Sequence, residues 1–191
     1  MKSNPTIERQ PLAADEPSSA LLRTLFTELV QTERSAEVHP KREAERYPGT
    51  PPAIAMLRVA AHAAAMRPQL VVLAETYGLE SGESTGTTLG EALSKMRELF
   101  IDKLVQTERS YRATLVGMRH GLDIVSLIRS VAYTSGAVEL AQWCDGWLEQ
   151  RPALVSEVEV AMHWFASNPE TAIAPTRTPN AVDTVLQALR G

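Results

Sequence analysis

The chain has 191 residues, 44% of them hydrophobic and 5% aromatic, and charges of both signs leave a net charge of −4. This length and apolar content predict one folded domain with a sizeable core and exclude an intrinsically disordered protein. The mixed charge excludes a nucleic-acid-binding surface, and no apolar run reaches the roughly 20 residues of a membrane span. A lone cysteine, Cys144, allows no intramolecular disulfide or cysteine cluster, which is typical of a cytoplasmic protein.

The N-terminal half predicts a flexible arm followed by two long helices. Residues 1–18 are polar and acidic, contain three prolines and do not resemble a signal peptide. Apolar residues then recur at helical spacing and predict a first helix over 19–46, which ends at the Pro- and Gly-rich segment 48–52. A second helix is expected over 52–77, with Gly78 as its C-terminal stop.

The C-terminal half predicts a linker and three further helices. Residues 79–89 are rich in Gly, Ser, Thr and Glu, and a third helix is expected over 89–119. Gly121 is expected to interrupt this helix and to leave a short one over 122–133. A last long helix is expected over 137–166.

Residues 167–191 are expected to form a Pro- and Thr-rich tail outside the bundle made by residues 19–166. After Asn180, apolar residues at helical spacing predict a short amphipathic helix. We expect this helix to bind its own bundle, a neighbouring subunit or another protein through four apolar side chains. These side chains belong to Val182, Val185, Leu186 and Leu189.

An internal repeat relates the two halves of the chain. The segment Leu29–Ser35, with the sequence LVQTERS, recurs unchanged as Leu104–Ser110. Further along, RPQLV at 67–71 resembles RPALV at 151–155. The first long helix therefore matches the third, and the second matches the last.

The length of the linker favours two helical hairpins joined by a long crossover. Helices of about 26 residues are about 39 Å long, and eleven extended residues span about 36 Å. The linker is thus nearly long enough to cross the bundle from end to end. A simple up-down-up-down bundle with a slack loop is the alternative.

This layout can be compared with a known family. The duplicated hairpin, the crossover and the last helix, with Gly136–Ala141 and then Trp143–Phe165, resemble the ferritin/rubrerythrin-like superfamily over residues 19–166. The resemblance implies an all-α, ferritin-like four-helix bundle with a short extra helix and a C-terminal helix. Members of this superfamily typically hold two iron or manganese ions between the four helices.

The residues of such a dinuclear site are present only in part. The site needs a Glu from each of two helices and a Glu-x-x-His from each of the other two. Glu33 and Glu108 are repeat partners and meet the first requirement, but no Glu-x-x-His occurs in the chain. The downstream repeat carries Arg67 and Arg151 instead. We therefore expect buried ion pairs in this region, with Arg67 level with Glu33 and Arg151 level with Glu108. The alternative is that each charge is solvated on its own helix.

These observations favour a non-catalytic bundle that acts through protein–protein contacts, as a homodimer and without a cofactor. The alternative is a metal-binding protein, either an oxidoreductase or an iron-handling protein, with iron or manganese in a rearranged site. The candidate ligands of that site are Glu33, Glu108, Glu75, Glu159 and His62. A third possibility is a protein that binds a small apolar ligand within the bundle.

The end of the chain suggests one further partner. Residues Thr184–Gly191 are similar to the short C-terminal loading peptides of encapsulin cargo proteins, many of which are ferritin-like. The sequence departs from that pattern at Leu186-Gln187-Ala188, where the family usually has a Gly-Ser turn.

Overall fold

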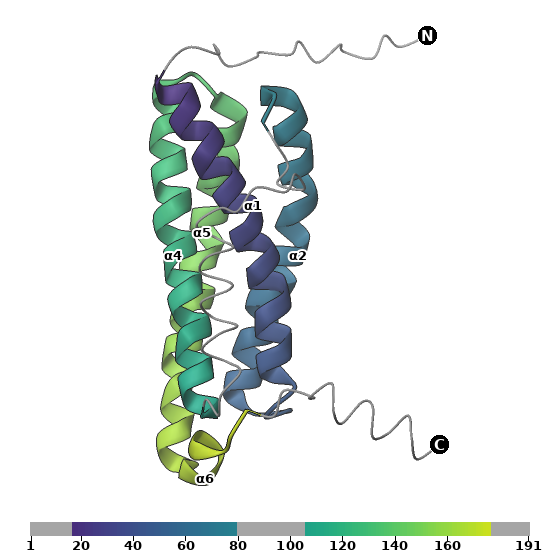
Figure 1. The fold of residues 1–191 in the computed structure, drawn as a ribbon, viewed down its shortest axis with the longest axis vertical. Helices are drawn as coiled ribbons and strands as arrows, with labels where there is room; N and C mark the ends of the chain where they lie inside the picture. Colours follow the sequence, from purple (N-terminus) through teal and green to yellow (C-terminus); the bar gives the residue numbers. More distant parts are fainter. Residues whose placement is uncertain (1–16, 80–105, 177–191) are drawn as a thin grey trace, which may run out of the picture.

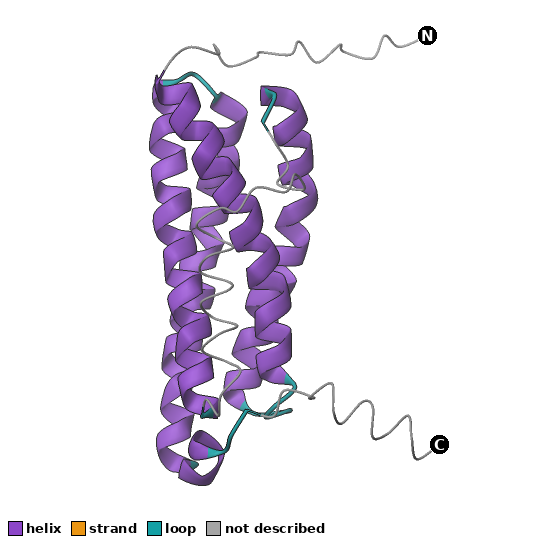
Figure 2. Cartoon of the chain, in the orientation of Figure 1, coloured by secondary structure: helices purple, strands orange, loops and turns teal. Residues whose placement is uncertain are grey.

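The computed structural model describes residues 17–79 and 106–176. These ranges are mostly helical, and they contain no strand (Figure 2). The expected all-α architecture is therefore confirmed. Four long helices lie side by side (Figure 1), namely α1 (Pro17–Ala44), α2 (Pro51–Tyr77), α4 (Thr107–Thr134) and α5 (Val138–Ala161). A 3-10 helix, η1 (Met162–Ser167), and the short α6 (Pro169–Ile173) follow α5.

Hydrogen bonds at the two ends of the bundle show how the helices are directed. At one end, Nη1 of Arg23, near the start of α1, donates to the carbonyl oxygen of Gly78, just after α2, at 3.0 Å. At the other end, Oγ of Ser110, near the start of α4, donates to Oε1 of Glu43, near the end of α1, at 2.6 Å. Helices α2 and α4 therefore run in one direction, and α1 and α5 run in the other (Figure 1).

The two residues that border the undescribed segment 80–105 lie at opposite ends of the bundle. Leu79 lies beyond the end of α2, at the end where α1 begins. Gln106 lies beside the chain that follows α6, where it forms an isolated bridge with Pro175. The up-down-up-down alternative is thus wrong, because it requires α2 and α4 to be antiparallel. The helix expected to begin at residue 89 has its first part outside the described residues.

Local sequence explains where α2 begins and ends. Oγ1 of Thr50 accepts a hydrogen bond from the backbone N–H of Ala53 at 3.5 Å. Pro51 and Pro52 follow, and proline suits the first turn because the amides there have no partner within the helix. At the other end, Gly78 has φ 62 and its backbone N–H donates to Ala74, which is a left-handed cap that glycine adopts without strain. The expected bounds of this helix are therefore close to the observed ones.

The break expected at Gly121 is wrong, because α4 continues through it from Thr107 to Thr134. Gly121 is buried, and a Cβ atom placed there would lie 3.1 Å from Cγ2 of Thr32 on α1 and 4.0 Å from the ring of Trp147 on α5. Its missing side chain therefore lets α4 approach α1 closely. The glycine is a packing residue in the middle of a helix and does not end one.

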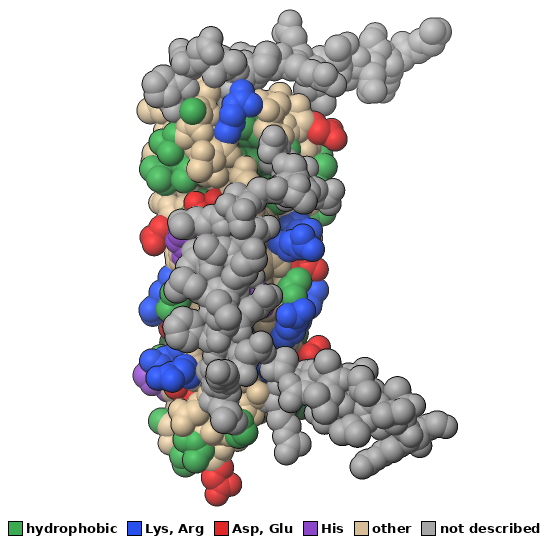
Figure 3. Space-filling view, in the orientation of Figure 1, with side chains coloured by type: hydrophobic (Ala, Val, Ile, Leu, Met, Phe, Trp, Pro, Cys, Tyr) green, Lys and Arg blue, Asp and Glu red, His purple; other side chains and the backbone are tan. Residues whose placement is uncertain are grey.

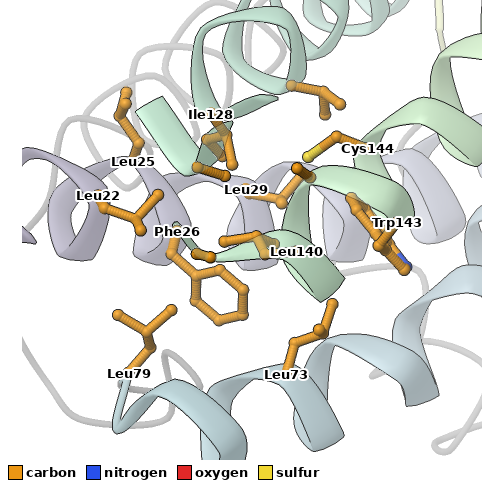
Figure 4. Close-up of a cluster of buried hydrophobic side chains, with 14 of the residues drawn as sticks. Leu22, Leu25, Phe26, Leu29, Leu73, Leu79, Ile128, Leu140, Trp143 and Cys144 are labelled. Carbon is orange, nitrogen blue, oxygen red and sulfur yellow. The ribbon is translucent and has the colours of Figure 1, made fainter. Parts of the chain in front are cut away.

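The core consists of two apolar clusters, one in each half of the bundle. The first cluster contains Leu22, Phe26 and Leu29 from α1 together with side chains from the other three long helices (Figure 4). The second is centred on Tyr111 and Phe165, whose rings lie 5.3 Å apart. A layer that contains charged side chains separates the two clusters.

After α5 the chain turns back to the start of α4. The backbone N–H and the Oγ1 of Thr107 both donate to the carbonyl oxygen of Ala174, each at 2.9 Å. The predicted amphipathic helix of the tail, with Val182 and Leu189, lies outside the described residues. None of the described helices combines the length and the apolar character needed to cross a membrane.

Candidate functional site

Three long helices each contribute one polar side chain to the layer between the two apolar clusters. Glu33 comes from α1, His62 from α2 and Arg151 from α5. Glu33 follows the buried Leu29 by one helical turn and precedes the buried Ala36, so helical spacing points it into the bundle. The layer is therefore a consequence of the sequence pattern of the helices.

Arg151 is the centre of this layer. Its Nη2 donates to Oε2 of Glu33 at 2.7 Å, and its Nε donates to Nδ1 of His62 at 3.0 Å. The guanidinium carbon also lies 4.7 Å from the ring centroid of Trp147, which is a cation–π distance. The side chains of Arg151 and Glu33 are 2% and 0% exposed, so the ion pair is screened very little by solvent.

Burial dominates the electrostatics of the layer. Desolvation raises the pKa of Glu33, and the positive charge of Arg151 opposes this shift. Desolvation, followed by the charge of Arg151, lowers the pKa of His62 to about 4. Because a guanidinium can only donate, Nδ1 of His62 must accept, and the proton of the neutral ring lies on Nε2. At neutral pH the layer therefore holds one ion pair and one neutral imidazole.

Nε2 of His62 is buried and has no hydrogen-bond partner in the described structure. Nε1 of Trp143, in the first apolar cluster, likewise has none. The indole N–H of Trp147 interacts with the Glu33 carboxylate and lowers its pKa. A buried polar atom without a partner costs about 1–3 kcal/mol. We therefore expect an apolar layer of the same volume to be about as stable as this one.

The structure places the other two members of the predicted ion pairs elsewhere. Nη1 of Arg67, on α2, donates at 2.5 Å to Oε2 of Glu37, which follows Glu33 by one turn on α1. Glu108 pairs with Arg112, one turn further along its own helix. The expectation that Arg151 lies level with Glu108 is thus wrong. Because α4 begins at Thr107, Glu108 lies in its first turn at the end of the bundle and not at mid-helix.

The residues proposed as ligands of a rearranged metal site are not brought together. Glu75 is exposed on α2, and Glu159 on α5 pairs with Arg119 on α4. The described residues contain no group of three or more His, Cys, Asp or Glu side chains that could hold a metal ion. Arg151 places a positive charge beside Glu33, where a cation would have to lie. The side chains present therefore do not fit a dinuclear carboxylate site.

A second buried polar cluster, which sequence reasoning missed, lies where α1 ends and α4 begins. Oε1 of Glu43 accepts from Oγ of Ser110 at 2.6 Å and from Nη1 of Arg46 at 2.7 Å. The hydroxyl of Tyr47 donates to Oε2 of Glu43 at 3.4 Å, and burial raises the pKa of this tyrosine. The available signal was the spacing of Glu43, at the end of α1, from Arg46 and Tyr47, which follow it by three and four residues.

Helix α2 also has apolar residues on its solvent-exposed side. Ile54, Leu57, Val71 and Val72 are each about half exposed, at 48%, 48%, 51% and 58%. Its opposite side is buried through residues such as Met56. The helix is thus apolar on both sides, whereas basic and acidic side chains are interspersed on the described part of the face shown in Figure 3.

A shallow groove lies beside this exposed face, between α2 and α5. It has a volume of about 680 Å³ and is lined at one edge by Ile54 and Arg58 and at the other by Glu157 and Val160. Nη1 of Arg58 donates to Oε2 of Glu157 at 2.6 Å and so bridges the two helices. The groove is therefore continuous with the exposed apolar face of α2.

Comparison with known proteins gives no relative. No family model matches the sequence, and neither a curated protein nor a solved structure matches the chain.

Proposed function

We propose that this protein is a non-catalytic helical bundle of ferritin-like topology that acts through contacts with other protein chains. The observation that carries the proposal is the exposed apolar face of α2, defined by Ile54, Leu57, Val71 and Val72. A helix that is apolar all round is normally buried on all sides. An exposed apolar patch on a folded protein marks an interaction site.

The polar layer supports the non-catalytic part of the proposal. The Glu33 carboxylate, which would be the natural ligand or base, is already neutralised by Arg151 and is closed off from solvent. The His62 ring is neutral at neutral pH because its pKa is about 4, so it cannot act as a general acid. Its Nδ1, which would act as a base, is occupied by Arg151. These side chains lock α1, α2 and α5 together, which is a structural role.

The directions of the helices support the ferritin-like part. Two antiparallel hairpins whose second and third long helices run in the same direction require one long connection, as in ferritin-like bundles. The resemblance implies metal ions between the four helices, and the Glu33–Arg151 ion pair lies in that region of this bundle. We therefore propose that an ion pair within the chain has replaced a bound cation.

A site-specific photo-cross-linking experiment in cells tests the contact. A photoreactive side chain at Leu57 is expected to yield a covalent adduct with a protein chain. The matched control is the same side chain at Val116, which is 62% exposed on α4, a helix that packs chiefly on α1 and α5. Equal yields from the two positions, or no adduct from Leu57, would contradict the proposed function. Two equivalents of iron or manganese per purified chain would contradict its metal-free part.

A further inference from the structure

The exposed face of α2 has the spacing of a coiled-coil seam. Successive exposed positions along this face are separated alternately by three and four residues. These positions are Ile54, Leu57, Ala61, Ala64, Pro68, Val71 and Glu75. A mean spacing of about 3.5 residues is the pattern by which one helix packs along another. The face thus has the form expected of a surface that receives a second helix.

Large apolar side chains lie near both ends of this face. Ile54 and Leu57 lie near the start of α2, Val71 and Val72 lie near its end, and the exposed Ala61, Ala64 and Ala65 lie between them. A second copy of α2 in the opposite direction would place Leu57 against Val72 and Ala64 against Ala65. This is the self-complementarity that a two-fold symmetric dimer requires.

Charge favours the antiparallel direction of two such helices. Among the exposed residues of α2, the charged ones are Arg58 near the start, which also pairs with Glu157 of its own chain, and Glu75 near the end. In an antiparallel pair, Arg58 of each copy lies within about one turn of Glu75 of the other copy. A parallel pair would place like charges opposite each other, which is unfavourable.

We infer that this protein forms a two-fold symmetric homodimer in which the exposed faces of α2 from two copies pack antiparallel, with the axis between Ala64 and Ala65. The inference rests on the proposed function and names the partner as a second copy of this chain. The groove between α2 and α5 then flanks the interface at both of its ends, beside Ile54 of each copy.

Cysteine cross-linking tests the geometry of this dimer. In an antiparallel dimer, Leu57 of one copy lies opposite Val72 of the other, whereas the two copies of Leu57 are about 22 Å apart. A short thiol cross-linker is therefore expected to join a mixture of Leu57→Cys and Val72→Cys chains, and to leave Leu57→Cys chains alone unjoined. The native Cys144 is buried and its pKa is raised to about 12 by burial, so the wild-type chain provides the blank. Efficient joining of Leu57→Cys to itself would overturn the antiparallel arrangement.

Sedimentation of the full chain and its variants tests the contacts. Leu57→Asp combined with Val71→Asp is expected to raise the dimer dissociation constant at least about 100-fold. Arg58→Glu and Glu75→Arg are each expected to raise it about three- to tenfold, and the double swap is expected to restore it to within about threefold. The matched control for the charge change is Arg119→Glu, which breaks a similarly exposed ion pair with Glu159 on another face and should leave the dimer intact. Circular dichroism confirms that each variant is folded.

The outcomes separate this inference from the proposed function. A chain that stays monomeric at about 100 μM, but whose photoreactive Leu57 variant still labels a different protein, overturns the homodimer and leaves the proposed function standing. A chain that dimerises with unchanged affinity in the Leu57→Asp/Val71→Asp variant also overturns it. A chain that is monomeric and labels nothing overturns both.

Discussion

The same seven residues, LVQTERS, occur in α1 and at the start of α4, and their glutamates lie in opposite environments. Glu33 is completely buried and pairs with Arg151 of another helix. Glu108 is 27% exposed and pairs with Arg112 on its own helix. The local sequence is identical, so the difference must come from the position of each copy within its helix.

The burial pattern shows how the two copies differ. In the first copy the buried side is marked by Glu33 and then Ala36, whereas in the second it is marked by Thr107, Ser110 and Tyr111. The buried side has therefore rotated by about one residue between the copies. A repeated segment predicts that both copies are helical, but it does not predict which side each helix turns toward the core.

The largest expected effect concerns the buried ion pair. Arg151→Met leaves the Glu33 carboxylate buried without its counter-ion, and we expect the free energy of unfolding to fall by about 3–5 kcal/mol. Arg112→Met removes the partner of the second glutamate at an exposed site and should cost less than about 0.5 kcal/mol. Urea denaturation followed by circular dichroism measures both. Equal losses would remove the distinction between the two copies.

A double variant provides the control for this prediction. Glu33→Leu combined with Arg151→Met replaces the ion pair with apolar side chains, and we expect the stability to return to within about 1 kcal/mol of the wild type or to exceed it. A double variant as unstable as Arg151→Met alone would show that the loss comes from packing and not from the buried charge.

The second prediction concerns the close contact that Thr32, in the first copy, makes with α4. Gly121→Ala places a methyl group 3.1 Å from Cγ2 of Thr32, and we expect a loss of about 1–3 kcal/mol in the free energy of unfolding. Gly117→Ala on the same helix meets no atom within 4 Å and should gain up to about 1 kcal/mol from helix propensity. Thermal unfolding of the two variants measures the contrast. A stabilised Gly121→Ala protein would show that the close packing of α4 on α1 does not require a glycine at this position.

The third prediction uses pH to detect the neutral imidazole beside Arg151. Because the pKa of His62 falls from 6.5 to about 4 on folding, the unfolded chain binds more protons between these values, and stability falls as pH falls through this window. His62→Gln removes this contribution. We expect the free energy of unfolding of the variant, relative to the wild type, to rise by about 1–2 kcal/mol from pH 6.5 to pH 4, which allows for partial exposure of the ring. A relative stability that does not change with pH would contradict the lowered pKa of His62.

The raised pKa of Glu33 acts in the opposite sense. It makes stability fall as pH rises above 4.5, in the wild type and in the variant alike, and so it largely cancels in the difference. His163→Gln changes an exposed histidine in η1 and is the matched control for the same measurement.

The last prediction concerns Glu108, the exposed glutamate of the second copy, and a small change in the free energy of unfolding. Glu108→Gln removes a carboxylate from the first turn of α4, where it interacts favourably with the helix dipole and with Arg112. We expect a loss of about 0.5 kcal/mol that disappears at high salt, because the site is partly exposed. A loss of several kcal/mol would mean that Glu108 is as important as Glu33. Denaturation at low and high ionic strength decides between these outcomes.

Much of the fold could be predicted because its signals are local. The cap at Thr50, the two prolines and Gly78 define α2 almost to the residue. The spacing of Glu33 between Leu29 and Ala36 also indicates a side chain that faces the core. Neither signal depends on residues far away in the sequence.

The rest depended on contacts between distant residues. Gly121 is tolerated within α4 because Thr32 lies against it, and no local pattern reveals that contact. Arg151 pairs with Glu33 because the side of α5 that carries it faces α1. It does not pair with Glu108 because α4 begins at Thr107 and so places Glu108 at the end of the bundle. The Glu43–Ser110 hydrogen bond likewise joins two helix ends that come together only in the folded bundle.

The separation of Glu33 and Arg151 along the chain has a consequence for protein synthesis. Glu33 is translated 118 residues before Arg151, so the α1–α2 hairpin leaves the ribosome with a carboxylate on its apolar side and without the side chain that hydrogen-bonds to it. We expect the first hairpin to remain open, with Glu33 in water, until α5 has been made. We therefore expect the buried charge to couple the folding of the two halves of the chain.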